Sequence, residues 1–216
     1  MSRAASSRQR RLLLLAACVA PLAAGCVSIG RDAPARVSYE LHDLGRAKPA
    51  PGAPLDLVVL VGWSSANTFY DSTSIVYSRT SGALAWYQFA SWSERPAEQL
   101  GRLFVRRLAG SGVFRDVATL SGAVRGDWLV ELQLERMLHD DANPPGVARI
   151  SVFARIVDRA NHRTVDSRRF DEEEPLATES AAGAVKAFDV AVTRLLDASV
   201  SWVAERATRA LPEAAR

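Results

Sequence analysis

Trp128-Leu129-Val130-Glu131-Leu132-Gln133-Leu134-Glu135 (residues 128–135) carries the clearest strand pattern in the chain. Its apolar residues recur at every second position, and this alternation runs on to Leu138. A period of two predicts a β-strand with one buried and one wet face. A loop at 140–146, a return strand at 148–158 and a third strand at 164–170 follow. Together they predict an antiparallel three-strand meander, whose second strand directs four side chains inward: Ile150, Val152, Ala154 and Ile156.

Upstream of the meander, short strands are expected at 37–41 and 55–61, and the second is apolar enough to be buried on both faces. A hairpin is expected at 73–89 around the turn at 80–82, and residues 113–117 could form a short strand. The segment 62–74 is expected to be a long loop. The acidic segment 171–175 is expected to be a break between the last strand and the closing helix.

Helical spacing of apolar residues predicts two main helices, at about 96–109 and 180–207. Strands in both halves of the chain with two helices predict an α/β or α+β layered fold. We therefore expect a mixed, largely antiparallel β-sheet with the helices packed on it, in a single domain at 37–210.

The N-terminus has the order of a secretory signal: four arginines, a short apolar run, then small residues before Cys26. The apolar run is near ten residues, whereas a membrane-spanning helix needs ~20. Small residues followed by cysteine resemble a bacterial lipobox, although Ala23 stands where a large aliphatic residue is usual. We expect a signal peptide at 1–25 and a lipid-modified Cys26 that begins a tether at 26–36. A plain cleaved signal or an uncleaved anchor are the alternatives.

The formal charge of the chain is +3, but four arginines lie in the expected signal. Without them, 23 basic residues face 24 acidic ones, which argues against a nucleic-acid partner. Cys26 is then the only cysteine of the mature protein, so no intrachain disulfide is expected.

Catalytic patterns are sparse. His139, Asp140 and Asp141 are adjacent and could bind a metal, but a polar hairpin loop is by far the simpler explanation of these residues. Ser64 follows a strand without the glycine pattern of a nucleophile elbow. A hydrolase would need a deep pocket that gathers His42 or His162 with a serine and a carboxylate. We expect no enzyme activity, metal or cofactor.

Aromatic residues are concentrated between positions 69 and 92, which hold seven of the sixteen in the chain. Alternation in a hairpin prevents all of them from facing one core. Exposed Trp and Tyr side chains often anchor interfaces; burial on both faces by helices is the alternative. We select five residues of this region as candidate partner contacts: Tyr77, Arg79, Trp86, Phe89 and Trp92.

The order of short motifs over the mature chain resembles the ABC-type transport auxiliary lipoproteins, the group that contains paraquat-inducible protein C. After Cys26 the matching motifs are Tyr39-Glu40-Leu41, Ile75-Val76-Tyr77, Trp92 with Pro96, an amphipathic helix, and Arg168-Arg169-Phe170 before the closing helix. Ser78 lies between Tyr77 and Arg79, whereas members of the family usually have arginine directly after the tyrosine.

The resemblance implies a non-catalytic accessory of a lipid transporter, anchored on the periplasmic face of the outer membrane. Its implied partners are a mammalian-cell-entry (MCE) domain protein and the associated ABC permease and ATPase, and a homo-oligomer is possible. Val27 replaces the aspartate that commonly retains lipoproteins on the inner membrane. A structural envelope lipoprotein without a transport role is the alternative, and the absence of an adjacent MCE-domain gene would favour it.

Replacing Cys26 with serine tests the anchor. Cells that express the protein should incorporate labelled palmitate into it, and Cys26→Ser should abolish this incorporation because the acylated thiol is lost. Cys18→Ser, which changes the cysteine inside the expected signal, should leave the label in place. Labelling that persists in Cys26→Ser would contradict the lipoprotein interpretation.

Overall fold

The computed structural model describes residues 35–121 and 124–210, so the predicted signal peptide, Cys26 and most of the tether lie outside the described residues. Two helices are described, α2 (Pro96–Gly110) and α3 (Ala181–Ala210). The eight strands are β1 (Val37–Tyr39), β2 (Leu55–Ser65), β3 (Ser74–Ser78), β4 (Ala85–Trp92), β5 (Phe114–Thr119), β6 (Trp128–Asp140), β7 (Val147–Asp158) and β8 (Arg163–Pro175). The predicted mixed sheet with two helices is confirmed.

Strand β6 is the centre of the sheet. One of its edges pairs with β7 along the whole strand, and β7 pairs in turn with β8, so the three form the predicted antiparallel meander. The other edge is shared: residues 128–134 pair in parallel with β2, and residues 139–140 pair in parallel with β3. Strand β5 lies beyond β2, whereas β4 and then β1 lie beyond β3.

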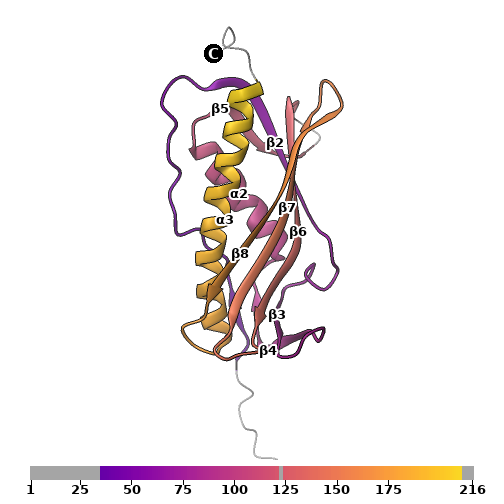
Figure 1. Ribbon diagram of the computed structural model, residues 1–216, viewed down its shortest axis with the longest axis vertical. Coiled ribbons are helices and arrows are strands. Elements are labelled where there is room, and N and C mark those ends of the chain that lie inside the picture. Colours follow the sequence, from indigo (N-terminus) through magenta and orange to yellow (C-terminus); the bar gives the residue numbers. More distant parts are fainter. Residues whose placement is uncertain (1–34, 122–123, 211–216) are drawn as a thin grey trace, which may run out of the picture. The chain divides into compact units, whose positions relative to one another are not determined.

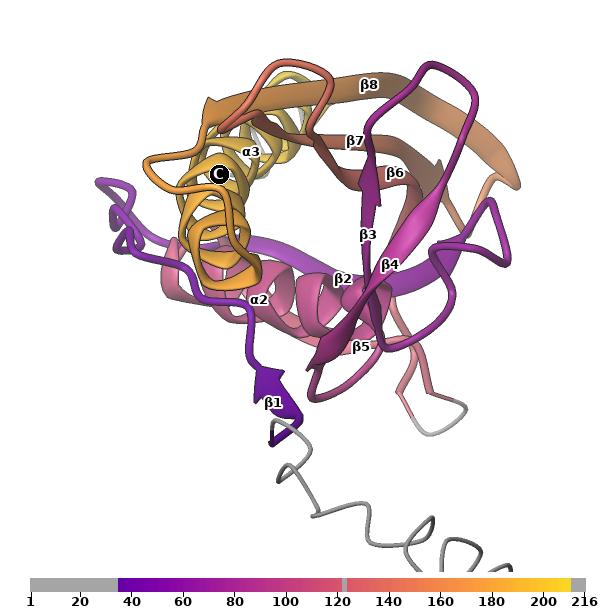
Figure 2. The ribbon, with the colours of Figure 1, turned by 90° about the horizontal axis from the view of Figure 1, so that it is seen from below.

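The helices cover one face of the curved sheet (Figures 1 and 2). Helix α3 packs on β7 and β8, and α2 packs on β2 and β5. The predicted apolar face of α2 is buried: Leu100, Leu103, Phe104 and Leu108. Trp63 packs closely against Gly101, where an added Cβ would be 2.3 Å from the indole ring. In the described ranges, neither helix is long and apolar enough to cross a membrane.

Two segments predicted to be irregular are strands. Residues 62–65 continue β2 alongside β6. The acidic segment 171–175 continues β8 instead of breaking it. Its charges are met by arginines of neighbouring elements, since Arg149 contacts Glu173 and Arg194 contacts Glu172 at 2.9 Å and Glu174 at 2.7 Å. Paired carboxylates remove the repulsion that would otherwise oppose an acidic strand.

A bulge in β6 reverses the facing that simple alternation predicts for the residues after Leu134. The register with β7 shifts between Leu134 and Arg136. A β-bulge adds one residue to a strand and reverses the facing of all side chains after it. His139 therefore lies on the core side, opposite Ala148, whereas Leu138 lies on the outer side opposite Arg149.

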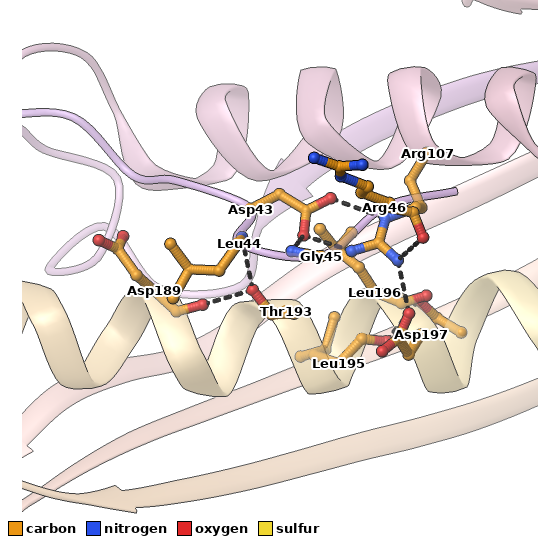
Figure 3. A network of polar contacts seen from close by, with 11 residues as sticks. Asp43, Leu44, Gly45, Arg46, Arg107, Asp189, Thr193, Leu195, Leu196 and Asp197 are labelled. Carbon is orange, nitrogen blue, oxygen red and sulfur yellow. Dashed lines mark hydrogen bonds and ion pairs between the residues drawn. The ribbon is translucent and has the colours of Figure 1, made fainter. Parts of the chain in front are cut away.

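The segment after β1 is held between the helices by a buried arginine (Figure 3). Arg107 of α2 has a side chain only 4% exposed. Its guanidinium donates two hydrogen bonds to Asp43, one to Asp197 of α3 at 2.5 Å and one to the Arg46 carbonyl at 2.9 Å. Thr193 adds a hydroxyl that accepts from the Leu44 N–H. The network joins α2, α3 and the 43–46 segment.

Asp43 makes this network dependent on pH. Burial raises the pKa of Asp43, but hydrogen bonds from the Arg107 guanidinium and the Gly45 N–H outweigh burial and hold the pKa below its usual range. A carboxyl whose pKa is lower in the folded state stabilises the fold above its unfolded pKa, about 3.9. That contribution is lost as the pH falls through the lowered pKa.

Arg107→Gln should destabilise the fold by roughly 3 kcal/mol, because it leaves a partly buried carboxylate without its ion-pair partner. For a chain of this size, the midpoint of thermal unfolding should fall by roughly 6–12 °C. The neighbouring Arg106, which is exposed and makes no ion pair within the described ranges, provides the matched control. Arg106→Gln should change the midpoint little, and equal effects of the two variants would contradict the role of the network.

Candidate docking surface

The candidate surface lies on the hairpin of β3 and β4. Val76 and Tyr77 pair with Trp86 and Ala85, but the register then shifts so that Ser74 pairs with Ser91. Four residues of β4, 87–90, therefore face a single residue of β3. The shift breaks simple alternation along β4, so consecutive side chains such as Gln88 and Phe89 are both exposed.

Trp86 and Phe89 are the exposed aromatic residues of β4, at 57% and 42%. Phe69, from the loop before β3, packs against Trp86 with ring centroids 5.3 Å apart. The prediction that some aromatics of this region are exposed is confirmed. We call Phe69, Trp86 and Phe89 the aromatic surface.

Tyr77 and Arg79 lie beside each other, while Trp92 does not belong to the surface. Tyr77 is half-buried, and the Arg79 guanidinium stands 5.1 Å from the centre of its ring. Trp92 is 3% exposed and packs edge-on against Phe188 of α3. The selection of Trp92 as a surface contact is corrected for this reason: its side chain is part of the core.

A buried polar cluster attaches the hairpin to the meander. His139 of β6 is fully buried, and its Nδ1 lies 2.8 Å from the hydroxyl of Tyr87 on β4. Its Nε2 lies 2.9 Å from the Pro145 carbonyl. Because a carbonyl can only accept, Nε2 carries the hydrogen and Nδ1 of the neutral ring accepts from Tyr87. The hydrogen bond therefore runs from the hairpin to the core strand.

Asp141 extends the cluster to the surface. Its Oδ2 accepts a 2.9 Å hydrogen bond from the Nε of Arg79, and its N–H donates to the Ser78 carbonyl. Burial, followed by the negative charge of Asp141, raises the pKa of Tyr87 to about 12. Tyr87 thus keeps its proton and remains a donor at neutral pH.

Gly146 is required beside this cluster. Its φ is +86°, and an added Cβ would lie 2.3 Å from Nε2 of His139. The residues 139–141, considered above as possible metal ligands, thus form structural contacts. Within the two described ranges, no group of three or more potential ligands could hold a metal ion.

Some of the residues considered above for a hydrolytic site lie close together. His42 and Ser93 line an open groove of about 240 Å³ together with Asp43 and Glu94. However, Nδ1 of His42 lies 3.6 Å from Asp189, and no hydrogen bond joins His42 to Ser93 in the described part of the chain. Nucleophilic catalysis depends on such a bond between base and nucleophile. His162 lies at the turn between β7 and β8.

The family model for the ABC-type transport auxiliary lipoprotein component matches residues 39–198. The chain belongs to this family. The match begins at the end of β1, ends within α3, and includes the hairpin and the buried cluster. No curated protein matches the sequence.

Two solved structures share the fold of this auxiliary lipoprotein. The crystal structure of protein XCC0632 from Xanthomonas campestris, of the family DUF330, is 26% identical with a TM-score of 0.70, covering 80% of this chain and 98% of that one. A crystal structure of an uncharacterized protein is 13% identical with a TM-score of 0.57, covering 73% and 99%. The resemblance inferred from the motifs is confirmed.

Tyr87→Phe should destabilise the fold by about 1–2 kcal/mol, because it leaves Nδ1 of buried His139 without a donor. Thermal unfolding should show a midpoint lower by a few degrees, and amide exchange in residues 74–92 should accelerate. Tyr77→Phe is the control, since the Tyr77 hydroxyl makes no hydrogen bond within residues 35–121 and 124–210. Unchanged stability and exchange in Tyr87→Phe would show that the cluster does not hold the hairpin.

Proposed function

We propose that this lipoprotein is a non-catalytic accessory of an MCE-type ABC lipid transport system and docks the periplasmic carrier at the outer membrane. The observation that carries the proposal is the aromatic surface on a hairpin that is firmly attached to the core. Family membership supports an association with a transport system, and the hairpin supplies a surface with which to make it.

The aromatic surface has the character of a binding site. Large aromatic side chains near the centre of an interface contribute most of its binding energy. Elsewhere on the outer face of the sheet, charges are paired across strands, as between Arg155 and Glu131 or Arg169 and Glu135. An exposed Trp in contact with Phe69, and a second exposed aromatic residue on the same strand, contrast with this charged surface.

The edge of β4 offers a second means of contact. Strand β1 pairs with β4 only from Ala90 to Trp92, so residues 85–89 have no strand on that side among the described residues. An extended segment of a partner can add to such an edge through backbone hydrogen bonds. The exposed aromatics would then contact the side chains of that segment.

The lipid anchor completes the proposal. A modified Cys26 would hold the domain at the outer membrane, and ten residues of tether can reach ~33 Å. One acyl chain binds a membrane only marginally, so we propose that Cys26 carries several. The carrier would thus be held close to the membrane that receives or supplies its lipid.

The docking surface is tested with the double variant Trp86→Ala, Phe89→Ala. Binding to the purified MCE-domain partner, measured by surface plasmon resonance, should weaken at least tenfold, as expected for interface anchors. The thermal midpoint should change by no more than a few degrees because both side chains are exposed. Leu120→Ala, a change of another half-exposed apolar residue, should bind normally. Undiminished binding of the double variant would refute docking through the hairpin.

A further inference from the structure

A groove of about 500 Å³ lies on the outer face of the sheet beside the β3–β4 turn. One wall is the turn itself, with Ser81 and Leu84, and Leu138 of β6 with Tyr70 provides a second apolar part. Three charged side chains also line it: Arg136, Arg149 and Asp140. The groove thus joins an apolar wall to a charged end, and its volume lies within the range of small-molecule sites.

Arg136 is the exceptional residue of this groove. The bulge in β6 lies directly before Arg136, and bulges commonly redirect a side chain. Arg149 is neutralised by Asp140 at 2.9 Å and by Glu173. Arg136, in contrast, is exposed and forms no ion pair with any residue of the described ranges.

Tyr70 lines the groove together with Arg136. The Tyr70 side chain is only 7% exposed, and burial raises its pKa while the positive charge of Arg136 opposes that rise. The Tyr70 hydroxyl makes no hydrogen bond within residues 35–121 and 124–210, so it can donate to a ligand. The groove therefore presents one uncompensated positive charge and a phenol donor beside aliphatic side chains.

These features match a phosphodiester that carries an apolar substituent. A guanidinium binds two phosphate oxygens with parallel hydrogen bonds. A phosphodiester carries one negative charge, which would neutralise the unpaired charge of Arg136. Leu84 is 38% exposed at the wall, where it can contact glycerol and acyl carbons. A soluble phosphate ester would use the arginine but not the aliphatic wall.

We propose that this groove binds the phosphodiester of a phospholipid, with Arg136 on the phosphate and Leu84 and Leu138 against the apolar part. For the identity of the ligand, the inference rests on the proposed role in lipid transport. It adds that this subunit itself contacts lipid, at a place separate from its own anchor.

The test uses the purified lipoprotein in a nonionic detergent and dihexanoylphosphatidylglycerol as the probe, with binding measured by isothermal titration calorimetry. Arg136→Gln should weaken binding by about tenfold or more, since a charge-assisted contact is lost. Leu84→Glu, which adds a carboxylate at an exposed wall position, should weaken it as well. Arg155→Gln is the matched control, because Arg155 is paired with Glu131 and lies outside the groove.

Two soluble probes identify the source of the phosphate. Glycerophosphoglycerol and inorganic phosphate should bind at least tenfold more weakly than the short-chain lipid, because neither uses the aliphatic wall. If either soluble probe binds as tightly as the short-chain lipid, the lipid assignment is wrong. It is also wrong if Arg136→Gln and Leu84→Glu are both folded and bind the short-chain lipid as tightly as the unchanged protein.

The same variants separate this proposal from docking. Arg136→Gln should still bind the MCE-domain partner, since Arg136 is not part of the aromatic surface. Loss of lipid binding in Arg136→Gln, with partner binding intact, would support the lipid site in the groove. If Arg136→Gln and Leu84→Glu still bind lipid while Trp86→Ala, Phe89→Ala loses the partner, the lipid site is refuted and the docking proposal is retained.

Discussion

The bulge in β6 is the constraint on which the rest of the structure depends. Before it, β6 buries Trp128, Val130 and Leu132 in the core while pairing with β2. After it the facing reverses, so that His139 enters the core and Arg136 is directed to the outer face. A strand without the extra residue would direct His139 outward and leave the Tyr87 hydroxyl without its acceptor. One inserted residue thus creates both the anchor of the hairpin and the charge of the groove.

The hairpin depends on side chains because its backbone attachment is short. Among the described residues, β3 pairs with β6 at two positions, Tyr77 and Ser78. Strand β4 reaches the sheet only through β3, because its other neighbour, β1, pairs with β4 alone. Hydrogen bonds from Tyr87 to His139 and from Arg79 to Asp141 add fixed contacts. A surface held this way is positioned in advance, so it loses less conformational entropy when a partner binds. The buried Arg107 network does the same for the segment at 43–46.

Periodicity made much of the fold predictable, and its failures have physical causes. The meander and both helices follow from repeats of two and about 3.6, because each element buries one face. The bulge could not be predicted, since the apolar residue Leu138 keeps the old alternation while lying under Tyr70 on the outer face. Trp92 and Trp86 look equivalent in the sequence, but the register shift in β4 sends one to the core and exposes the other. The acidic end of β8 looked like a break because its balancing arginines come from β7 and α3, far away in the sequence.

The aromatic surface and the groove are connected through two consecutive residues. Phe69 packs against Trp86, whereas Tyr70 lies within the groove, and their rings meet edge-on with centroids 6.3 Å apart. Both residues lie in the loop between β2 and β3 and are adjacent in the chain, so a displacement of Phe69 would also move Tyr70. A partner that covers Trp86 would also contact Phe69. Binding of a carrier at the hairpin and of lipid in the groove would therefore act on the same loop, which gives the two proposed sites a physical route by which each can change the affinity of the other.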